Sequence, residues 1–350
     1  MNLLEKTIRE VRPIDSQWID SAGRRQLELT KPPGSLGRLE EIANRCAAIR
    51  ESFTLSAARP RIVLFAADHG VCAEGVSPYP QAVTGQMVLN FLRGGAAINA
   101  IARAAEIELK VVDVGVATPL PLSSELISRR AAQGTRNFCE GPAMTEAEMT
   151  AALETGVELA CDAALAGCDL LGFGEMGIGN TTSASAVAAA LTGQPADAVV
   201  GCGAGADEPC MARKRSAIQR AMALHAASLV DPLGILRCLG GLEIAAMCGF
   251  CLAAAARRVP VVTDGFIATS AAALAVRLCP AASGYLFASH RSVEPGHAHL
   301  LAMLEQRPLL DLGMRLGEAT GAALAMKLIQ AAVAAFTQMA TFAAAGVSNK

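Results

Sequence analysis

Six short runs of apolar residues, each ending in glycine or in polar side chains, most constrain the fold of this 350-residue chain. Continuous rather than alternating hydrophobicity is typical of parallel β-strands that are covered on both faces. Spacings of about 25 to 60 residues leave room for the crossover helix that each parallel connection needs. The runs are residues 61–70 (RIVLFAADHG), 109–115 (LKVVDVG), 169–177 (DLLGFGEMG), 198–205 (AVVGCGAG), 259–266 (VPVVTDGF) and 284–290 (GYLFASH). We expect an α/β fold with a doubly wound, mainly parallel, Rossmann-like sheet that binds ligands at the carboxyl ends of its strands.

The two ends of the chain lack this regular spacing of apolar runs. Residues 1–56 are charged and helical in period, with a turn at TKPPGSLG, and the stretch from about 318 to 350 is helical without strands. We predict that these ends pack together as a small helical domain beside an α/β domain of residues 57–317. The apolar run from Leu328 to Asn349 is long enough to cross a membrane, but its glutamines, threonines and alanines favour a helix buried in the protein.

Composition and charge exclude several classes of protein. Hydrophobic residues make up 52% and aromatic residues 4%, which favours a helix-rich α/β protein over a β-sandwich. The 30 Lys and Arg oppose 32 Asp and Glu without long blocks of one sign, so neither nucleic acid nor a membrane is an expected partner. The eleven cysteines are scattered singly and the N-terminus has no signal-peptide core. We therefore expect reduced thiols in a cytoplasmic protein.

Gly172, Gly174 and Gly177 satisfy the GxGxxG pattern of dinucleotide-binding proteins. A nicotinamide dehydrogenase needs an acidic residue at the end of the following strand, where it grips the ribose. Asp197 has a suitable distance in sequence, but it precedes the run 198–205 and would lie at the wrong end of that strand. The dehydrogenase is therefore the weaker hypothesis.

A simpler interpretation of the same segment is an anion cradle. Gly177 and Gly179 let backbone amides approach a ligand, and Asn180 is expected to cap a helix whose N-terminus attracts anions. No G-K-[ST] follows, so a triphosphate loop is not supported. The alternative is an ordinary strand–helix turn in which the glycines serve packing. Glu175 speaks against that alternative, since a carboxylate beside an anion cradle is costly unless it faces a cationic centre.

Other candidate residues follow the later runs. Glu318 lies among small residues that would raise its pKa by desolvation, which suits a general base. Ser289, His290, Arg291 and Ser292 lie at the end of one run and just after it, and are expected to donate hydrogen bonds to a phosphate or carboxylate. His290, His297 and His299 lack the acids and spacing of a known metal site. Lys214 is either a solvated lysine or a contact to an anionic substrate.

Six motifs, taken together, resemble those of the nicotinate-nucleotide–dimethylbenzimidazole phosphoribosyltransferase family. In order they are KPPGSLGRLE (31–40), ADHGV (67–71), GEMGIGNTT (174–182), DGF (264–266), SHRSVEPG (289–296) and MRLGEATGAALAM (314–326). The resemblance runs from about residue 25 to the C-terminus. It implies a parallel α/β domain with a helical domain from both termini, and a homodimer in which the neighbour closes the site.

The resemblance also implies a reaction. Phosphoribose moves from nicotinate mononucleotide to 5,6-dimethylbenzimidazole, giving α-ribazole 5′-phosphate and nicotinate with inversion at C1′, a step in cobalamin nucleotide-loop assembly. Because the leaving group departs as a neutral pyridine, no metal or other cofactor is expected. The run VVTDGF agrees with this, since it has one acid, Asp264, where pyrophosphate-dependent phosphoribosyltransferases typically have two in succession.

By the same resemblance, individual residues receive roles. Glu318 is the general base, Glu175 stabilises positive charge developing on the ribose, and Lys214 contacts an anionic group of the donor. The phosphoribose would be held by Gly177, Gly179, Asn180, Thr181, Asp264, Ser289, His290 and Ser292. The base would lie between Tyr79, Gln86, Met87, Met176 and Leu316. A non-catalytic nucleotide sensor remains the other alternative, although such a relative would be expected to lose Glu318.

Overall fold

The computed structural model describes residues 2–348 and contains the expected parallel sheet. All five strand pairings are parallel, and the strand order is β3-β2-β1-β4-β5-β6. This is the order of a doubly wound sheet. The strands before β4 extend from β1 toward one edge and the later strands extend toward the other, so the strand order reverses between β1 and β4. The strands are β1 (Pro60–Ala67), β2 (Glu108–Gly115), β3 (Leu126–Ser128), β4 (Leu170–Met176), β5 (Val261–Thr263) and β6 (Leu286–Ala288).

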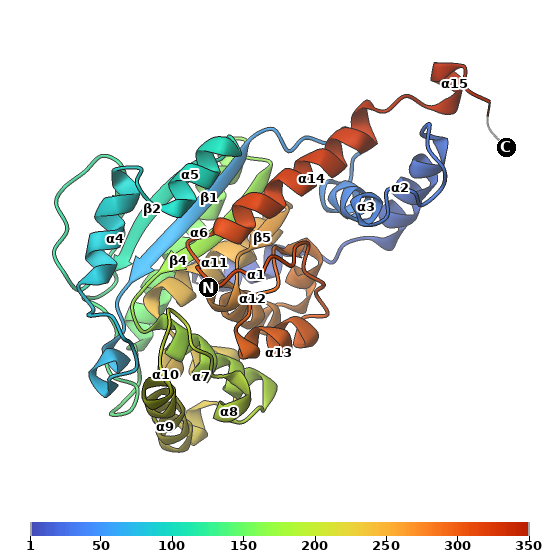
Figure 1. Ribbon diagram of the computed structural model, residues 1–350. Coiled ribbons are helices and arrows are strands. Elements are labelled where there is room, and N and C mark those ends of the chain that lie inside the picture. Colours follow the sequence, from blue (N-terminus) through green and yellow to red (C-terminus); the bar gives the residue numbers. More distant parts are fainter. Residues whose placement is uncertain (1, 349–350) are drawn as a thin grey trace.

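Helices cover both faces of the sheet (Figure 1). On one face lie α4 (Val83–Leu92), α5 (Ala97–Ala104) and the first part of α14 (Thr320–Gln338). On the other lie α6 (Glu146–Leu165), α11 (Leu242–Ala256) and α12 (Phe266–Leu278). The central strands β1 and β4 are buried almost throughout, as continuous apolar runs require. The other α-helices that the structure describes between β4 and the C-terminus are α7 (Asn180–Thr192), α8 (Ala196–Val199), α9 (Glu208–Leu224), α10 (Pro232–Leu239), α13 (Pro295–Met303) and α15 (Phe342–Ala345).

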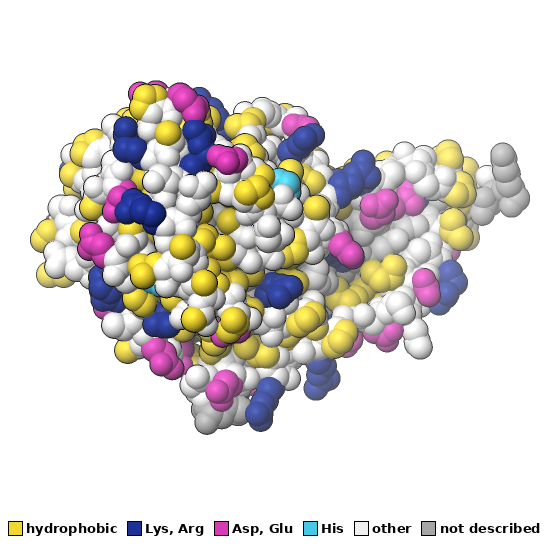
Figure 2. Space-filling view, turned by 90° about the horizontal axis from the view of Figure 1, so that it is seen from below, with side chains coloured by type: hydrophobic (Ala, Val, Ile, Leu, Met, Phe, Trp, Pro, Cys, Tyr) yellow, Lys and Arg dark blue, Asp and Glu magenta, His cyan; other side chains and the backbone are white. Residues whose placement is uncertain are grey.

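The terminal helices gather at one end of the molecule. Helices α2 (Ser16–Glu28) and α3 (Arg38–Arg50) pack together, and α3 also packs against α14. Figure 1 shows this group projecting beyond the sheet, and the same narrow end appears on the right in Figure 2. Helix α1 (Leu3–Glu10) instead packs against α6 and α11 on the body of the molecule. Whether the terminal group is a separate domain stays a prediction.

One expected strand is absent and one unexpected strand is present. The expectation of a strand at 198–205 is wrong, because Ala196–Val199 forms the short helix α8 after Pro195 and a loop follows it. Val199 is fully buried, so its hydrophobicity reflects packing under neighbouring helices rather than a place in the sheet. The edge strand β3 escaped prediction because it is only three residues long and partly exposed.

The C-terminal helix α14 has the length and apolarity of a membrane span, with a mean hydropathy of 1.4. In the protein, 56% of the apolar stretch of this helix is buried. The helix packs against β4, β5, α3 and α5. Its apolar composition is therefore accounted for by packing on the sheet. On the face seen in Figure 2, exposed charges of both signs are interspersed among hydrophobic side chains.

Candidate active site

A cavity of about 680 Å³ lies at the carboxyl ends of the central strands. Its wall includes the last residues of β4, the beginnings of α7 and α12, the loop that follows β6, and the turn before α14. Because the strand order reverses between β1 and β4, the connections that follow these two strands run to opposite faces of the sheet and leave a crevice between them. The sheet therefore places the cavity where parallel α/β folds bind their ligands.

Glu318 lies in the wall of this cavity within an unusual turn. Gly317, Glu318 and Ala319 all have left-handed backbone, with φ of 86°, 60° and 65°. Among residues 2–348 this is the one place where two adjacent residues other than glycine have positive φ. Each such residue costs about 1–2 kcal/mol, and strain of this kind concentrates at functional sites.

The carboxyl group of Glu318 is suited to accept a proton. The residue is 6% exposed, and its Oε2 is buried without a hydrogen-bond partner. Burial is the main cause that raises the pKa of Glu318, the backbone amide of Ile98 lowers it, and the charge of Asp264 raises it. A carboxyl group with a raised pKa and an unpartnered oxygen, on a residue that lines a cavity, has the properties of a general base.

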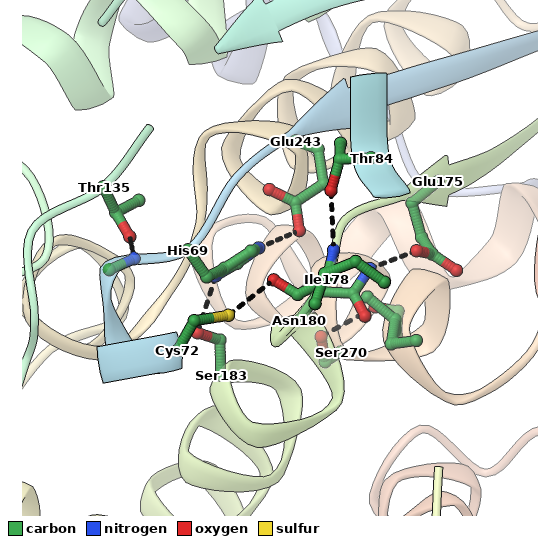
Figure 3. Close-up of polar contacts among 12 residues, drawn as sticks. His69, Cys72, Thr84, Thr135, Glu175, Ile178, Asn180, Ser183, Glu243 and Ser270 are labelled. Atoms are coloured by element: carbon green, nitrogen blue, oxygen red, sulfur yellow. Dashed lines mark hydrogen bonds and ion pairs between the residues drawn. The ribbon is translucent and has the colours of Figure 1, made fainter. Parts of the chain in front are cut away.

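Glu175 ends β4 close to the same turn. An added Cβ on Gly317 would come within 2.6 Å of Glu175 Oε1, so glycine lets the turn approach this carboxyl group closely. Burial, the charges of Glu243 and Asp264 and, to a smaller degree, Glu318 raise the pKa of Glu175 well above its usual range. The amide of Asn180 donates a hydrogen bond to Glu175 Oε2 (Figure 3).

The expectation that Asn180 caps α7 is wrong. The N-cap residue is Gly179, with φ of 96°, and Asn180 is the first helical residue. Its side chain turns to Glu175, and two amides at the helix start are already used, since the N–H of Asn180 donates to Gly177 O and that of Thr182 to Gly179 O. The turn can present fewer free amides to an anion than the sequence suggested.

The three glycines of the GxGxxG pattern serve packing. A Cβ on Gly172 would come within 2.6 Å of Met326 Cε, and a Cβ on Gly174 would overlap the backbone of Ala319. Both glycines therefore let α14 lie directly on β4. A Cβ on Gly177 would overlap the carbonyl oxygen of Ala67 at the end of β1. The packing alternative accounts for all three, although Gly177 also lines the cavity.

The loop of residues 201–204 forms another part of the wall. Lys214, which is 3% exposed, donates to Thr181 Oγ1 at 3.2 Å and to the carbonyl of Gly201 at 3.3 Å. The N–H of Gly203 donates to Glu294 Oε1 at 2.9 Å. Burial lowers the pKa of Lys214, and the charge of Glu294 raises it. The ammonium of Lys214 thus lies just behind Thr181 and Gly203, which line the cavity.

The loop after β6 brings His290, Ser292 and Glu294 to the cavity. His297 fixes this loop, since its Nδ1 accepts from the N–H of Ser292 at 2.9 Å and its Nε2 lies 3.0 Å from Thr269 Oγ1. Burial lowers the pKa of His297 to about 3, so the ring is neutral. Among the described residues, no group of three or more His, Cys, Asp or Glu could hold a metal ion.

Several lining residues are apolar or aromatic. They include Tyr79 before α4, Met87 within α4, Met176 at the end of β4, and Leu316 before the strained turn. Thr84 Oγ1 accepts from the N–H of Ile178 at 3.0 Å, which ties α4 to the β4–α7 turn (Figure 3). A flat apolar ring would fit against such a surface.

A buried polar network supports the cavity from beneath. His69 Nε2 lies 2.6 Å from Glu243 Oε1, and its Nδ1 lies 2.9 Å from Ser183 Oγ in α7 (Figure 3). His69 and Glu243 are both fully buried. The nearby Cys72 Sγ donates to the carbonyl of Ile178 at 3.2 Å. The segment after β1, which includes part of the family motif ADHGV (67–71), therefore holds the β4–α7 turn from below.

Comparison with known proteins decides the family. A model of a phosphoribosyltransferase family matches residues 11–347. The nicotinate-nucleotide–dimethylbenzimidazole phosphoribosyltransferase of Chloroflexus aggregans is 53% identical over 350 residues, covering 100% of this chain and 99% of the relative. That of Geobacter metallireducens is 49% identical over 349 residues, again covering 100% of this chain and 99% of the relative. The chain belongs to the nicotinate-nucleotide–dimethylbenzimidazole phosphoribosyltransferase family.

Solved structures agree with this assignment. The crystal structure of the family member from Thermus thermophilus has a TM-score of 0.90 at 49% identity, and the alignment covers 96% of this chain and 100% of that chain. The family resemblance seen in the six motifs and the doubly wound α/β fold class are both confirmed. The chain is therefore a phosphoribosyltransferase.

The structure brings most of the predicted site residues of this family member together. The cavity is lined by Tyr79, Met87, Glu175, Met176, Gly177, Asn180, Thr181, His290, Ser292, Leu316 and Glu318. Of the residues predicted to bind substrate or act in catalysis, Gln86, Gly179, Lys214, Asp264 and Ser289 do not line it. Gln86 is exposed on α4, and Ser289 donates to the carbonyl of Asp264 at 2.9 Å. The catalytic and binding roles themselves stay predictions.

Sequence reasoning missed several lining residues. Glu294 and Arg315 both line the cavity, and Arg315 Nη1 donates to the carbonyl of Gly203 at 3.2 Å. Both stand inside family motifs, SHRSVEPG and MRLGEATGAALAM, so the motifs already contained the signal. Other missed residues are Val83, Ile178, Gly203, Ala204, Gly265, Phe266, Ile267 and Gly317. Gly265, the N-cap of α12, and Phe266, its first residue, also stand inside a family motif, DGF, so only the residues outside the motifs depend on the docking of the elements.

Proposed function

We propose that this protein transfers phosphoribose from nicotinate mononucleotide to 5,6-dimethylbenzimidazole, giving α-ribazole 5′-phosphate and nicotinate for the lower-ligand nucleotide of cobalamin. The relatives' names state the two substrates. The observation in this chain that carries the proposal is Glu318, a buried carboxyl group with an unpartnered oxygen, which lines a cavity together with apolar and aromatic side chains. An aromatic base against those side chains would have a proton acceptor beside it.

The proposed mechanism is a single displacement. Glu318 accepts the proton from one benzimidazole nitrogen while the other nitrogen attacks C1′ of the ribose. Attack from the face opposite the pyridine inverts the β-nucleotide to the α-product. A negative charge on Glu175 is costly in the empty cavity, because its pKa is raised by burial and by neighbouring carboxylates. The pyridinium ring and the charge developing at C1′ would offset that cost.

The anionic end of the donor would lie toward the loop of residues 201–204. The charges nearby favour this, because Lys214 stands behind Thr181 and Gly203 and Arg315 reaches the same loop. The hydroxyl of Ser292 and the start of α12 add hydrogen-bond donors on the same side of the cavity. Lys214→Met is expected to raise KM for nicotinate mononucleotide more than KM for the base.

The dehydrogenase hypothesis loses its remaining support. Asp197 lies on α8, with its side chain 72% exposed, and pairs with Arg215 at 3.3 Å rather than facing the cavity. The glycines that suggested a dinucleotide fold instead allow α14 to pack on β4. The sensor hypothesis is disfavoured by the retained Glu318.

Homodimer formation and a cytoplasmic location are also part of the proposal. Tyr79, Leu312 and Leu316 are 49%, 59% and 57% exposed, and Tyr79 and Leu316 line the cavity. Apolar side chains exposed at a cavity wall suit closure by a neighbouring subunit. Light scattering of the purified protein tests the dimer, and a monomer at micromolar concentration would contradict it.

The central experiment is direct. Purified protein is incubated with nicotinate mononucleotide and 5,6-dimethylbenzimidazole, with and without EDTA, and the products are identified by chromatography and mass. Equal amounts of α-ribazole 5′-phosphate and nicotinate are expected in both conditions. A β-configured product would refute inversion, and the absence of product would refute the proposed reaction.

A further inference from the structure

The strained turn at Gly317, Glu318 and Ala319 needs an external support. Glu318 and Ala319 both have the left-handed backbone that L-residues avoid. Ala319 is also the N-cap of α14, and alanine has no side-chain oxygen to satisfy the free amides of the first turn. The N–H and the hydroxyl of Thr320 donate to the carbonyl of Gly317 at 3.1 and 2.7 Å, but no side chain of the turn accepts from the amides of Ala319 or Ala322.

Asp264, which lies outside the turn, provides a hydrogen-bond acceptor for each of these two amides. It follows β5 and is 1% exposed. Its Oδ2 accepts from the N–H of Ala319 at 3.1 Å, and its Oδ1 accepts from the N–H of Ala322 at 3.0 Å. A carboxylate from another element thus does for α14 what an N-cap residue usually does, and its negative charge faces the positive end of the helix dipole.

Asp264 is itself fixed in place. Its carbonyl accepts from Ser289 Oγ at 2.9 Å, and its Oδ1 lies 3.9 Å from Nδ1 of His290. On the other side of the turn, Ala319 lies so close to Gly174 of β4 that a Cβ added there would overlap the backbone of Ala319. Residue 319 is therefore held between the ends of β4 and β5, one residue from Glu318.

We infer that Asp264 is a positioning residue, which holds the left-handed turn that directs Glu318 into the cavity, rather than a residue that binds the phosphoribose. The inference rests on the proposed function only in making Glu318 the base. Two observations favour it over substrate contact. Both carboxyl oxygens of Asp264 are engaged by backbone amides of α14, and Asp264 is not among the described residues that line the cavity, although Gly265 and Glu318 are.

The groups around Glu318 make the inference testable by pH. Glu318 faces Asp264 from the β5–α12 connection, Glu175 from β4 and the amide of Ile98 from α5, while His290 adjoins Asp264. Removing the negative charge of Asp264 removes one cause that raises the pKa of Glu318. The rise of kcat with pH, which follows deprotonation of the base, would then shift to lower pH.

The main variant is Asp264→Asn. Its amide group cannot accept from both Ala319 and Ala322, so the turn loosens. We expect kcat to fall about tenfold or more, KM for both substrates to change less than about threefold, and the acidic limb of kcat to move to lower pH. A raised KM for nicotinate mononucleotide with an unmoved acidic limb would overturn the inference in favour of substrate contact.

The matched control is Asp169→Asn. Asp169 is a second buried aspartate that accepts from two backbone amides, those of Ala58 and Arg59, at 3.1 and 2.9 Å. It precedes β4 and so lies at the end of the sheet opposite the cavity. This variant measures the general effect of losing a buried carboxylate, and its acidic limb should match that of the unmodified protein. An equal shift in both variants would contradict a specific role for Asp264.

Rescue separates positioning from general instability. Glycine adopts positive φ freely, so Ala319→Gly makes the turn less dependent on Asp264. The double variant Asp264→Asn/Ala319→Gly should recover part of the kcat that the single variant loses, while Ala319→Gly alone stays near the unmodified protein. If Asp264→Asn cannot be purified, the double variant is compared with Ala319→Gly, and an unmoved acidic limb overturns the inference.

Hydrogen exchange gives a result that does not depend on turnover. Peptides covering residues 317–322 should exchange faster in Asp264→Asn than in Asp169→Asn, because the amides of Ala319 and Ala322 lose their acceptor. Unchanged exchange would refute the support of the turn. If the unmodified protein forms no α-ribazole 5′-phosphate, the proposed function fails, and the exchange result still decides whether Asp264 holds the turn.

Discussion

Glu318 combines burial, an unpartnered oxygen and a strained backbone in one residue. Glu318→Gln keeps the shape of the side chain and removes its basicity. We expect kcat to fall by about 10²- to 10⁴-fold while KM for nicotinate mononucleotide stays nearly constant. In the unmodified protein kcat should rise with pH as Glu318 loses its proton, with a midpoint above the usual glutamate range, and the variant should lack this rise. Initial rates across the acidic range test both, and a variant at full rate would exclude Glu318 as the base.

Glu175 is a carboxyl group whose charge opposes folding. Its pKa in the folded protein is raised well above its usual value, chiefly by burial. Such a group stabilises the fold fully only below its unfolded pKa, and this stability is lost as pH rises through the folded pKa. Glu175→Gln, whose amide oxygen can still accept from Asn180, should therefore raise Tm at neutral pH, while the difference shrinks toward pH 4. Thermal unfolding at a series of pH values measures this difference, and a lower Tm at neutral pH would contradict the account.

At the same scale, the sequence indicates which residues belong to the candidate site better than it indicates which residues they form hydrogen bonds with. Glu318 and Glu175 could be found because each is an acid among small or apolar residues. The role of Asp264 could not, because its two hydrogen bonds reach residues 55 and 58 positions later, and only the docking of α14 beside β5 creates them. Asn180 was expected at an N-cap because of its residue type. The structure assigns that position to Gly179, whose positive φ the tight turn requires.

At the scale of elements, the contact between β4 and α14 sets the geometry of the site. Gly174→Ala would place a Cβ against the backbone of Ala319, next to Glu318. Since neither backbone can yield cheaply, we expect a loss of about 1–3 kcal/mol in the free energy of unfolding, together with a lower kcat. Gly141→Ala is the control, because no atom lies within 4 Å of the added Cβ. Thermal unfolding and initial rates measure both effects, and equal behaviour of the two variants would show that the contact is tolerant.

The elements that sequence reasoning predicted well are those with a strong hydrophobic run. Strands β1, β2 and β4 lie where they were expected, since burial on both faces produces runs of seven or eight residues. The run at 198–205 was wrongly predicted to be a strand. It consists of the end of a short helix and a loop that forms hydrogen bonds with Glu294 and Lys214, and its residues are as apolar as those of a strand. Periodicity cannot separate these cases over so few residues, and only the packing of α8 beneath α13 does.

At the scale of the whole molecule, α14 joins the candidate active site to the terminal helices. It begins beside Glu318 and ends near α2 and α3, where the N–H of Thr30 donates to the carbonyl of Ala340 at 3.1 Å. The aromatic rings of Trp18, Phe53 and Phe336 pack edge to face there, with centroids 5.5 and 5.8 Å apart. Because one continuous helix belongs to both regions, we expect unfolding of the terminal helices to destabilise the turn that holds Glu318.

This connection predicts cooperative unfolding, and the single tryptophan makes it measurable. Trp18 fluorescence reports on the terminal helices, whereas far-ultraviolet circular dichroism reports on all helices and the sheet. We expect the two thermal transitions to coincide, because the terminal group cannot separate without disrupting α14. Phe336→Ala, which removes a side chain that is 2% exposed, should lower both midpoints together, at a cost of about 3–5 kcal/mol. A fluorescence transition that precedes the dichroism transition would instead show that the terminal helices form an independent domain, with α14 able to fray from its C-terminal end while Glu318 stays in place.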